Sequence, residues 1–369
     1  GKTLTPHQAI HPGLLIKDEL AARDIKQTDL AADTNIQPTQ LSEILKGKRP
    51  LSTEHALLIA AVLDTSPEVW TEMQAKYDLH KAQIESGMAA RLEALKQLQE
   101  IRKVVDVNYF RREGIVTGRA VADVQGLLNA HDYTTVQQLV EHLTADTPAG
   151  TFYKKSEKLV EYKPFVNSWV RYVKHLALRE KVAAFDFDCQ DELIGQVKKI
   201  FQGSDVKNKL STTFKEYGIK LVFQGKPDKT PLDGAALWQD KNPILALTER
   251  HSRYDNFLFT VYHELGHIFL HLKDKKNRTG GFVDSLDAVG TKGLEAKENE
   301  ANTFARNTTV PANMWADFVD SHSSFTDDII GRFAKAMHVP APSIWGRLCF
   351  EKRADYACFS VHRKTNIIP

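Results

Sequence analysis

The chain has 369 residues, enough for two or three domains, and 42% of them are hydrophobic, enough to bury ordinary globular cores. Its formal net charge of +2 gives no strong overall field that would point to nucleic acid or to a membrane surface. Three cysteines without a CxxC pair exclude a disulfide framework, and no apolar run could span a bilayer, so we expect a cytoplasmic protein without a membrane partner.

The first 80 residues predict a small all-helical domain. Apolar residues recur at helical spacing in two segments, namely Leu14, Leu15, Leu20 and Ala21, then Leu41, Ile44 and Leu45, and residues 26–31 open a short helix between them. Pro38 suits the first turn of the third helix, and Gly47 suits its end. The predicted order is helix, short helix, turn and helix, within a domain at residues 1–80.

Two sequence segments of this domain carry a resemblance to known regulators. QTDLAADTNIQPTQLSEILKGKRPLS (27–52) resembles the helix-turn-helix of the XRE family, and SPEVWTEMQAKYDL (66–79) resembles the HigA antitoxin branch of that family. The resemblance implies that the second helix of the motif enters the major groove of a double-stranded DNA operator. Base edges would be read by Gln37, Thr39 and Gln40, and phosphates would be held by Lys46, Lys48 and Arg49.

Charge favours a different interpretation of the same domain. Residues 1–80 hold eight Lys or Arg and eleven Asp or Glu, a net charge of 8 − 11 = −3, whereas DNA-binding domains are usually basic. The alternative is a small bundle that serves for dimerisation only. The local cluster of Lys46, Lys48 and Arg49 supports DNA binding, and one such domain reads a half-site, which implies a homodimer on the operator.

The middle of the chain predicts further helices and no site. Residues 83–107 form an amphipathic run, and two shorter helical segments follow within residues 115–145. We expect a helical linker region at residues 81–150.

Strands are expected only after residue 214. IKLVF (219–223) is apolar and β-branched, and AALWQ (235–239) and PILAL (243–247) flank the turn-like residues 240–242, which predicts a hairpin. The fold class is therefore mainly α with a small β-sheet, with an α+β domain at residues 151–350 and a polar tail at residues 351–369.

The strongest chemical signal is TVYHELGHIFLHLK (260–273), which contains HExxH. Residues four apart share a helix face, so His263 and His267 can present two imidazoles to one metal ion. Glu264 then suits a base that takes a proton from a metal-bound water. His271 also lies on this face but one turn farther along, where we expect it to support the site or to pack in the core without binding the metal. A chance HExxH on an ordinary helix is the alternative.

A second segment, ENEANTFA (298–305), supplies candidates for the third ligand of a zinc site. Glu298, Glu300 and Asn302 are the candidates, and Glu298 shares a helix face with Asn302. HELGHxxLH followed by ExEANxFA and a proline resembles the ImmA/IrrE family of metallopeptidases, over roughly residues 150–350. The resemblance implies a zincin-like fold, a Zn²⁺ cofactor, His263, His267 and Glu300 as ligands, and Glu264 as the catalytic residue.

Two functions remain open at this point. The chain is either a DNA-binding regulator with a zinc-dependent endopeptidase-like domain, which cleaves a repressor, a partner protein or itself, or a HigA-type antitoxin and repressor. In the second case the peptidase-like domain binds or senses a partner, such as a toxin, without catalysis.

Overall fold

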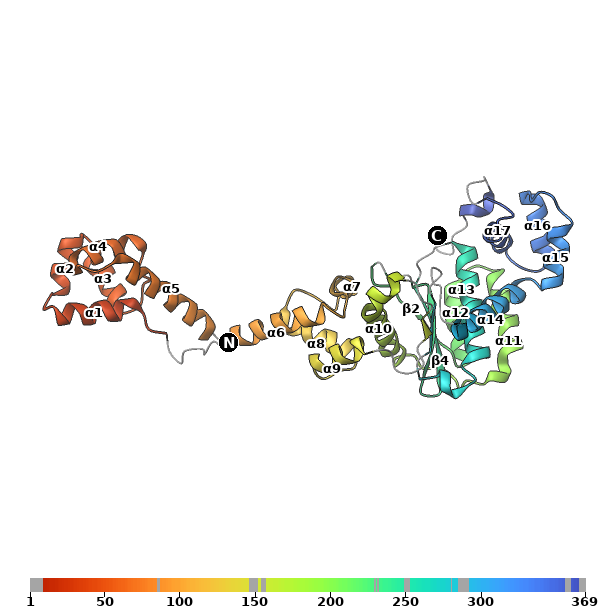
Figure 1. The fold of residues 1–369 in the computed structure, drawn as a ribbon, viewed down its shortest axis with the longest axis horizontal. Coiled ribbons are helices and arrows are strands. Elements are labelled where there is room, and N and C mark those ends of the chain that lie inside the picture. Colours follow the sequence, from red (N-terminus) through yellow and green to blue (C-terminus); the bar gives the residue numbers. More distant parts are fainter. Residues whose placement is uncertain are drawn as a thin grey trace. The chain divides into compact units, whose positions relative to one another are not determined.

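The chain forms two compact units, residues 1–96 and residues 97–369, here called unit 1 and unit 2. The computed structural model (Figure 1) describes the residue ranges 9–84, 87–145, 152–153, 157–228, 230, 232–248, 253–279, 281–284, 292–355 and 360–364. It is mainly helical with one small sheet, which confirms the predicted fold class. Among the described residues, none of the helices is both long and apolar enough to span a bilayer.

Unit 1 is a helical bundle that contains the predicted helix-turn-helix. Its helices are α1 (Pro12–Ala22), α2 (Gln27–Thr34), α3 (Pro38–Leu45), α4 (Thr53–Leu63), α5 (Pro67–Ile84) and the first part of α6 (Met88–Ile101). Asn35 ends α2 in the left-handed conformation, with φ 55°, and Gly47 follows α3 with φ 68°. The turn between α2 and α3 is thereby set by local sequence, and the buried faces of α1 to α5 meet in one core.

A close backbone contact holds α1 against α3. His11 caps α1 by accepting a hydrogen bond from the Gly13 N–H at 3.0 Å, and its ring packs edge-on against Tyr77 with centroids 4.7 Å apart. A Cβ atom at Gly13 would lie 1.9 Å from the carbonyl oxygen of Ile44. Only glycine allows this approach, so Gly13 fixes the position of α3.

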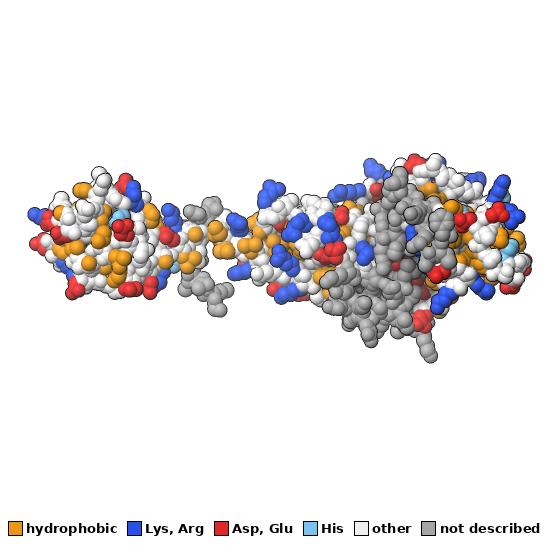
Figure 2. Space-filling model, turned by 90° about the horizontal axis from the view of Figure 1, so that it is seen from above, with side chains coloured by type: hydrophobic (Ala, Val, Ile, Leu, Met, Phe, Trp, Pro, Cys, Tyr) orange, Lys and Arg blue, Asp and Glu red, His pale blue; other side chains and the backbone are white. Residues whose placement is uncertain are grey.

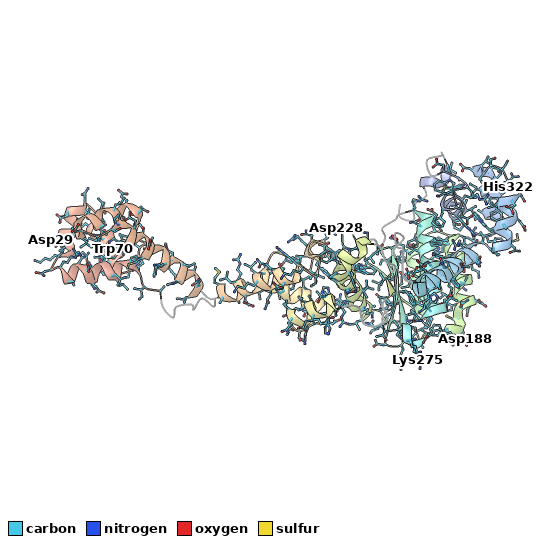
Figure 3. All side chains as sticks on the ribbon, in the orientation of Figure 1. Asp29, Trp70, Asp188, Asp228, Lys275 and His322 are labelled. Atoms are coloured by element: carbon cyan, nitrogen blue, oxygen red, sulfur yellow. The ribbon has the colours of Figure 1, made fainter. Side chains whose placement is uncertain are left out.

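The segment that resembles the HigA branch forms the first part of α5 and packs on the bundle. Trp70, which is labelled in Figure 3, is buried, and its Nε1–H donates to Thr65 Oγ1 at 2.9 Å. The buried amide of Gln74 accepts from the Leu51 N–H at 2.9 Å and donates to Asp78 at 2.9 Å. Gln74 therefore braces the loop between α3 and α4, and Trp70 braces the loop between α4 and α5.

Unit 2 begins inside the region expected to be a linker. Its first helices are the end of α6, α7 (Val107–Arg112), α8 (Ala120–Ala130) and α9 (Val136–Thr144), and they pack through α8 and α9 on α10 (Glu157–Ala177). The predicted linker at 81–150 thus falls on both sides of the division between the units, and its part after residue 96 belongs to the compact body of unit 2.

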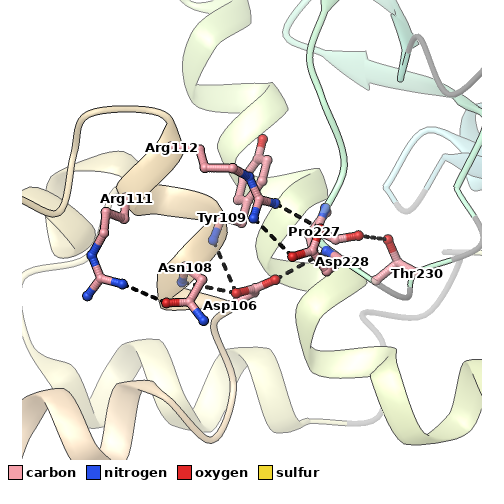
Figure 4. Close-up of polar contacts among 8 residues, drawn as sticks. All are labelled: Asp106, Asn108, Tyr109, Arg111, Arg112, Pro227, Asp228 and Thr230. Atoms are coloured by element: carbon pink, nitrogen blue, oxygen red, sulfur yellow. Dashed lines mark hydrogen bonds and ion pairs between the residues drawn. The ribbon is translucent and has the colours of Figure 1, made fainter.

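Polar contacts join α7 to the loop that precedes the third strand (Figure 4). Asp106 caps α7 with one carboxylate oxygen and accepts from the Asp228 N–H at 3.2 Å with the other. The Arg112 guanidinium donates to both oxygens of Asp228, at 2.9 and 3.0 Å. Tyr109 accepts from the buried Gln224 amide at 2.7 Å. The paired hydrogen bonds between Arg112 and Asp228 have a specific geometry. They anchor the helices of residues 97–145 on the sheet domain.

The sheet has the strand order β1-β5-β3-β4-β2. The strands are β1 (Phe152–Tyr153), β2 (Lys220–Phe223), β3 (Gly234–Gln239), β4 (Asn242–Leu247) and β5 (Phe282–Asp284). β3 and β4 form the predicted antiparallel hairpin, with Gln239 opposite Asn242, and β2 is parallel to β4. β1 and β5 were not predicted, and β1 contradicts the expectation of strands only after residue 214. These two strands pair parallel with each other, and β5 pairs antiparallel with β3.

Helices cover both faces of this sheet. Figure 1 shows α10 on one face, and on the other face α11 (Gln190–Phe201), α12 (Val206–Glu216), α13 (Tyr254–Gly266) and α14 (Lys292–Thr309). α13 contacts β3, β4 and α14, and its side chains Phe257, Leu258, Val261 and Leu265 are buried in the main core. The HExxH motif therefore lies on a buried helix directly beneath the sheet.

Three helices after α14 form a second, smaller core. They are α15 (Ala312–Asp320), α16 (Asp327–Ala336) and α17 (Ala341–Phe350), and α17 packs on α13. Part of the expected tail folds back on them, because Asp327 accepts hydrogen bonds from the Ser360 hydroxyl at 2.8 Å and the Val361 N–H at 3.1 Å.

His131 should make the stability of unit 2 depend on pH. Its ring is fully buried, donating from Nδ1 to the Leu127 carbonyl at 2.7 Å and contacting Ser168 through Nε2 at 2.8 Å. Burial lowers the pKa of His131 from 6.5 to about 4. Below pH 6.5 the unfolded chain takes up a proton that the folded chain does not, so the free energy of unfolding falls with decreasing pH until about pH 4.

The expected slope from this one group is up to about 1.4 kcal/mol per pH unit in that window. Thermal unfolding of the wild type and a His131→Gln variant at about pH 7 and about pH 5 measures it, and the variant should lose less stability on acidification. An equal loss in both proteins would contradict this prediction.

Candidate metal centre

Two histidine rings converge where α13 ends. His263 lies in the last turn of α13, and His267 begins a π-helical turn, η2 (His267–His271). Both side chains are buried, and their Nε2 atoms are 3.0 Å apart. The predicted spacing thus brings both imidazoles to one point inside the protein, with the π-turn, a feature frequent at functional sites, directly behind them.

Glu298 of α14 completes this cluster. Its side chain is 2% exposed, and its carboxylate oxygens lie 3.4 Å from Nε2 of His263 and 3.4 Å from Nε2 of His267. Glu300, which the family resemblance implied as the third ligand, lies elsewhere. Its side chain is 60% exposed and accepts from Nε2 of His271 at 2.9 Å. This geometry supports Glu298, not Glu300, as the third candidate ligand.

Glu298 faces the two histidines and Glu300 does not, because the two side chains leave α14 in different directions. Residues two apart on a helix point about 200° from each other, so Glu298 and Glu300 cannot both face α13. Asn302, four residues after Glu298, shares its face, and its amide oxygen lies 3.1 Å from Nδ1 of His263. Asn302, the other candidate ligand of the sequence, therefore holds the far side of the His263 ring.

Small residues bring α14 close enough to α13 for this arrangement. A Cβ atom at Gly266 would lie 3.2 Å from Cα of Ala301, and Ala301 is fully buried. The glycine inside HELGH thus permits a close helix crossing at the point where Glu298 reaches the two histidines. A larger residue at position 266 would push α14, and with it the carboxylate, away.

Glu264 faces the sheet from the same helix. Its side chain is fully buried, and a Cβ atom at Gly234, the first residue of β3, would lie 2.5 Å from Glu264 Oε1. The absence of a side chain at position 234 therefore makes the space that this carboxylate occupies. Gly234 stands in the DGAALW segment, where its role was not predicted.

The donor set fits a zinc ion. Two imidazole nitrogens and one carboxylate are a common protein ligand set for zinc, and tetrahedral ligands about 2.1 Å from zinc lie about 3.4 Å from one another. The observed separations of 3.0 and 3.4 Å are close to that value. Among the described residues, the Glu298 oxygens have no regular hydrogen-bond partner, and their contacts to the imidazoles are 3.4 Å long. A buried carboxylate of this kind is costly without a cation.

The electrostatics of the cluster favour the protonation state that binds metal. Burial lowers the pKa of His267 to about 3, so its ring is neutral. Burial alone would raise the pKa of Glu298, but the two facing imidazoles outweigh it and hold the pKa of this carboxyl well below its usual range. Neutral imidazole and ionised carboxylate are the forms that donate to a metal ion.

Two residues around His267 complete the site. Its ring stacks on Phe282 of β5, with centroids 4.5 Å apart and planes at 15°. Its Nδ1 lies 2.9 Å from Nδ1 of His271, which is buried and has its pKa lowered by that burial. A supporting position was expected for His271. Phe282 was missed, and the only signal for it was the apolar pair Phe282–Val283 within a polar stretch.

The residues expected to contact DNA lie around α3 in unit 1. Gln37 precedes α3 as its N-cap residue, and Gln37 and Thr39 are exposed while Gln40 is half-buried. Lys46, Lys48 and Arg49 are exposed, and the Arg49 guanidinium pairs with Glu43 at 2.9 Å. Figure 2 shows acidic and basic side chains interspersed on the face of unit 1 in view. The ion pair between Arg49 and Glu43 lies on the surface and is therefore weak, so Arg49 can leave Glu43 for a DNA phosphate.

Comparison with known proteins identifies a domain in each unit. Residues 16–70 match the family described as helix-turn-helix, and residues 214–343 match the family described as IrrE N-terminal-like domain.

Individual relatives match the N-terminal part. Virulence-associated protein A′ of Dichelobacter nodosus is 43% identical over 70 residues, 19% of this chain and 61% of that protein. The uncharacterized HTH-type transcriptional regulator YbaQ of Escherichia coli (strain K12) is 31% identical over 83 residues, 22% of this chain and 72% of that protein. The structure of an addiction module antidote protein of the HigA family from Coxiella burnetii is 33% identical, covers 22% of this chain and 88% of its own, and has a TM-score of 0.21.

Proposed function

Because the chain belongs to the helix-turn-helix family of regulators and carries an IrrE N-terminal-like domain, we propose that it is a DNA-binding regulator with a zinc-dependent endopeptidase. Its substrate is a repressor, a partner protein or the chain itself. The observation that carries this proposal is the buried cluster of His263, His267 and Glu298, with the buried Glu264 next to His263 in α13.

Each residue has a separate role in this proposal. Nε2 of His263, Nε2 of His267 and the Glu298 carboxylate hold the ion, and Glu300 is not assigned to it. A bound zinc ion would supply a Lewis acid that polarises a peptide carbonyl and acidifies water. The Glu264 carboxylate accepts the proton that water loses and returns it to the nitrogen of the broken peptide bond. The net reaction adds one water across one amide.

The burial of Glu264 supports chemistry over a purely structural cluster. A structural zinc site is closed by four protein ligands, whereas three ligands leave a position open for water or substrate. A domain that only binds a partner does not require an additional fully buried carboxylate beside its metal ligands. Burying such a group costs free energy, and its use as a base explains why it is present.

A second candidate function is that of a HigA-type antitoxin and repressor, which binds a toxin without cleaving it. It is favoured by the segment 66–79, whose Trp70 and Gln74 are integral to the fold of unit 1.

Co-expression with the products of adjacent genes separates the two functions. A new terminus on a neighbour or on the chain, found by mass spectrometry, supports the peptidase. A stable complex with intact partners supports the antitoxin, as would a small toxin-like reading frame beside the gene.

DNA binding by a homodimer at the promoter of its own operon is the other half of the proposal. Gln40→Ala should weaken binding to the specific operator by about 1–3 kcal/mol if the amide pairs with a base, and it should change non-specific binding little. Lys48→Ala should instead weaken specific and non-specific binding alike, since it removes a phosphate contact. Footprinting upstream of the gene measures the binding of both variants. The absence of a protected palindrome would count against the proposal.

A further inference from the structure

We propose that Glu300 and His271 are positioning residues that fix the tautomer and orientation of His267 for metal binding. This inference rests on the proposed zinc site and assigns a new role to the carboxylate that the sequence pattern had suggested as a ligand. The observation behind it is an unbroken chain of contacts, from Glu300 to His271 at 2.9 Å and from His271 to His267 at 2.9 Å.

The hydrogen positions along this chain follow from the types of its atoms. An ionised carboxylate only accepts, so Nε2 of His271 carries the hydrogen that it donates to Glu300. A neutral imidazole has a single N–H, so Nδ1 of His271 is an acceptor. Nδ1 of His267 must then be the donor in the contact between the two rings. The lone pair of His267 is thereby left on Nε2, the atom that faces His263 and Glu298.

The local backbone explains how two histidines four apart can meet ring to ring. η2 is a π-turn, closed by a hydrogen bond from the Leu272 N–H to the His267 carbonyl at 3.0 Å. Phe282 contacts both rings, with centroids 4.5 Å from His267 and 5.1 Å from His271. The π-turn and the phenyl ring hold the pair in place, so the direction of the hydrogen bonds is decided at the outer end, by Glu300.

Metal-binding histidines usually donate their second ring nitrogen to a carboxylate or carbonyl, and removing that partner typically weakens metal binding by about 10- to 100-fold. Here the Glu300 carboxylate does not contact His267 itself, but acts on it through His271. Because the Glu300 side chain is 60% exposed, its replacement should leave the fold intact. The effect on the metal can then be measured without unfolding the protein.

Three substitutions at position 300 separate the hydrogen-bond pattern from other effects. Glu300→Gln keeps an oxygen acceptor for His271 and should bind zinc as the wild type does. Glu300→Ala removes the acceptor and should weaken zinc binding by about 10-fold or more. Glu300→Lys presents only donors, which favours the opposite tautomer in both rings and places a hydrogen on the His267 nitrogen that faces the metal, so it should weaken binding most.

The matched control is Asn299→Lys, because Asn299 is the exposed neighbour on the same helix and the change adds a positive charge without touching His271. The full-length protein is titrated with Zn²⁺ against a chromophoric chelator, and the visible spectrum of its Co²⁺-loaded form reports ligand geometry. The inference predicts that Asn299→Lys and Glu300→Gln match the wild type while Glu300→Ala and Glu300→Lys do not.

Two results overturn the inference while leaving the proposed function intact. One is unchanged zinc affinity and unchanged cobalt spectra in Glu300→Ala and Glu300→Lys. The other is an equal loss of zinc affinity in Asn299→Lys and Glu300→Lys. A wild type that binds no metal would instead contradict the proposed function itself, and this inference with it.

Discussion

Replacing Glu264 with Gln is expected to stop peptide hydrolysis while zinc stays bound. Gln has the shape of Glu but cannot take the proton from water, and general-base catalysis typically contributes about 10²- to 10⁴-fold. His263, His267 and Glu298 are untouched, so the metal content should equal that of the wild type. The measurement compares cleavage of the co-expressed neighbour or of the chain itself, by mass spectrometry, with zinc per chain in both proteins.

A second variant approaches the same carboxylate from the sheet. A Cβ atom in Gly234→Ala would meet Glu264 Oε1 at 2.5 Å, so the carboxylate must move, and hydrolysis should fall without loss of zinc. Gly225→Ala is the matched control, because no atom lies within 4 Å of the added Cβ atom there. If wild type and Glu264→Gln cleave equally, or if neither cleaves, the catalytic proposal fails and the antitoxin function is the better account.

Gly13→Ala is expected to unfold unit 1, or nearly so. The added Cβ atom would lie 1.9 Å from the Ile44 carbonyl oxygen, and backbone on both sides leaves no flexible side chain to yield. Overpacking of a core typically costs about 1–3 kcal/mol, and a clash between two helix backbones should lie at or above the upper end of that range. Since α3 carries Gln40, operator binding should be lost as well.

Circular dichroism during heating and operator binding measure this effect. Leu14→Ala, at the next position, is the control, because that side chain is 44% exposed and its loss should cost little. Zinc binding should persist in Gly13→Ala, since the proposed ligands lie in unit 2, a separate compact unit. A variant that melts with the wild type and still binds the operator would contradict the close contact between α1 and α3.

Local sequence predicted much of this fold because the relevant signals are local. Pro38 and Gly47 bracket α3, and the turn residues between Leu237 and Ile244 favour a hairpin locally. The HExxH spacing likewise needs only a helix to bring His263 and His267 together. β5 was not predictable in this way, since its three residues form a strand beside β3 and β1, two partners distant in sequence.

The choice of Glu298 as the proposed third ligand was within reach of the sequence. Glu298, Ala301, Asn302 and Ala305 recur at the spacing of one helix face, and the two alanines are fully buried against α13. Glu300 lies off that face. A motif resemblance names residue types, but the phase of the helix decides which carboxylate points inward. The π-turn and the contact of His271 with Glu300 had no signal beyond the spacing of the histidines.

Zinc content per chain is the most direct test of the account. The wild type, Glu298→Ala and Glu300→Ala would be purified alike, equilibrated with equal zinc, dialysed and measured by plasma mass spectrometry. The account predicts about one zinc per chain in the wild type, almost none in Glu298→Ala, and a clear but weakened zinc occupancy in Glu300→Ala. Full zinc in Glu298→Ala with none in Glu300→Ala, or no zinc in the wild type, would contradict it.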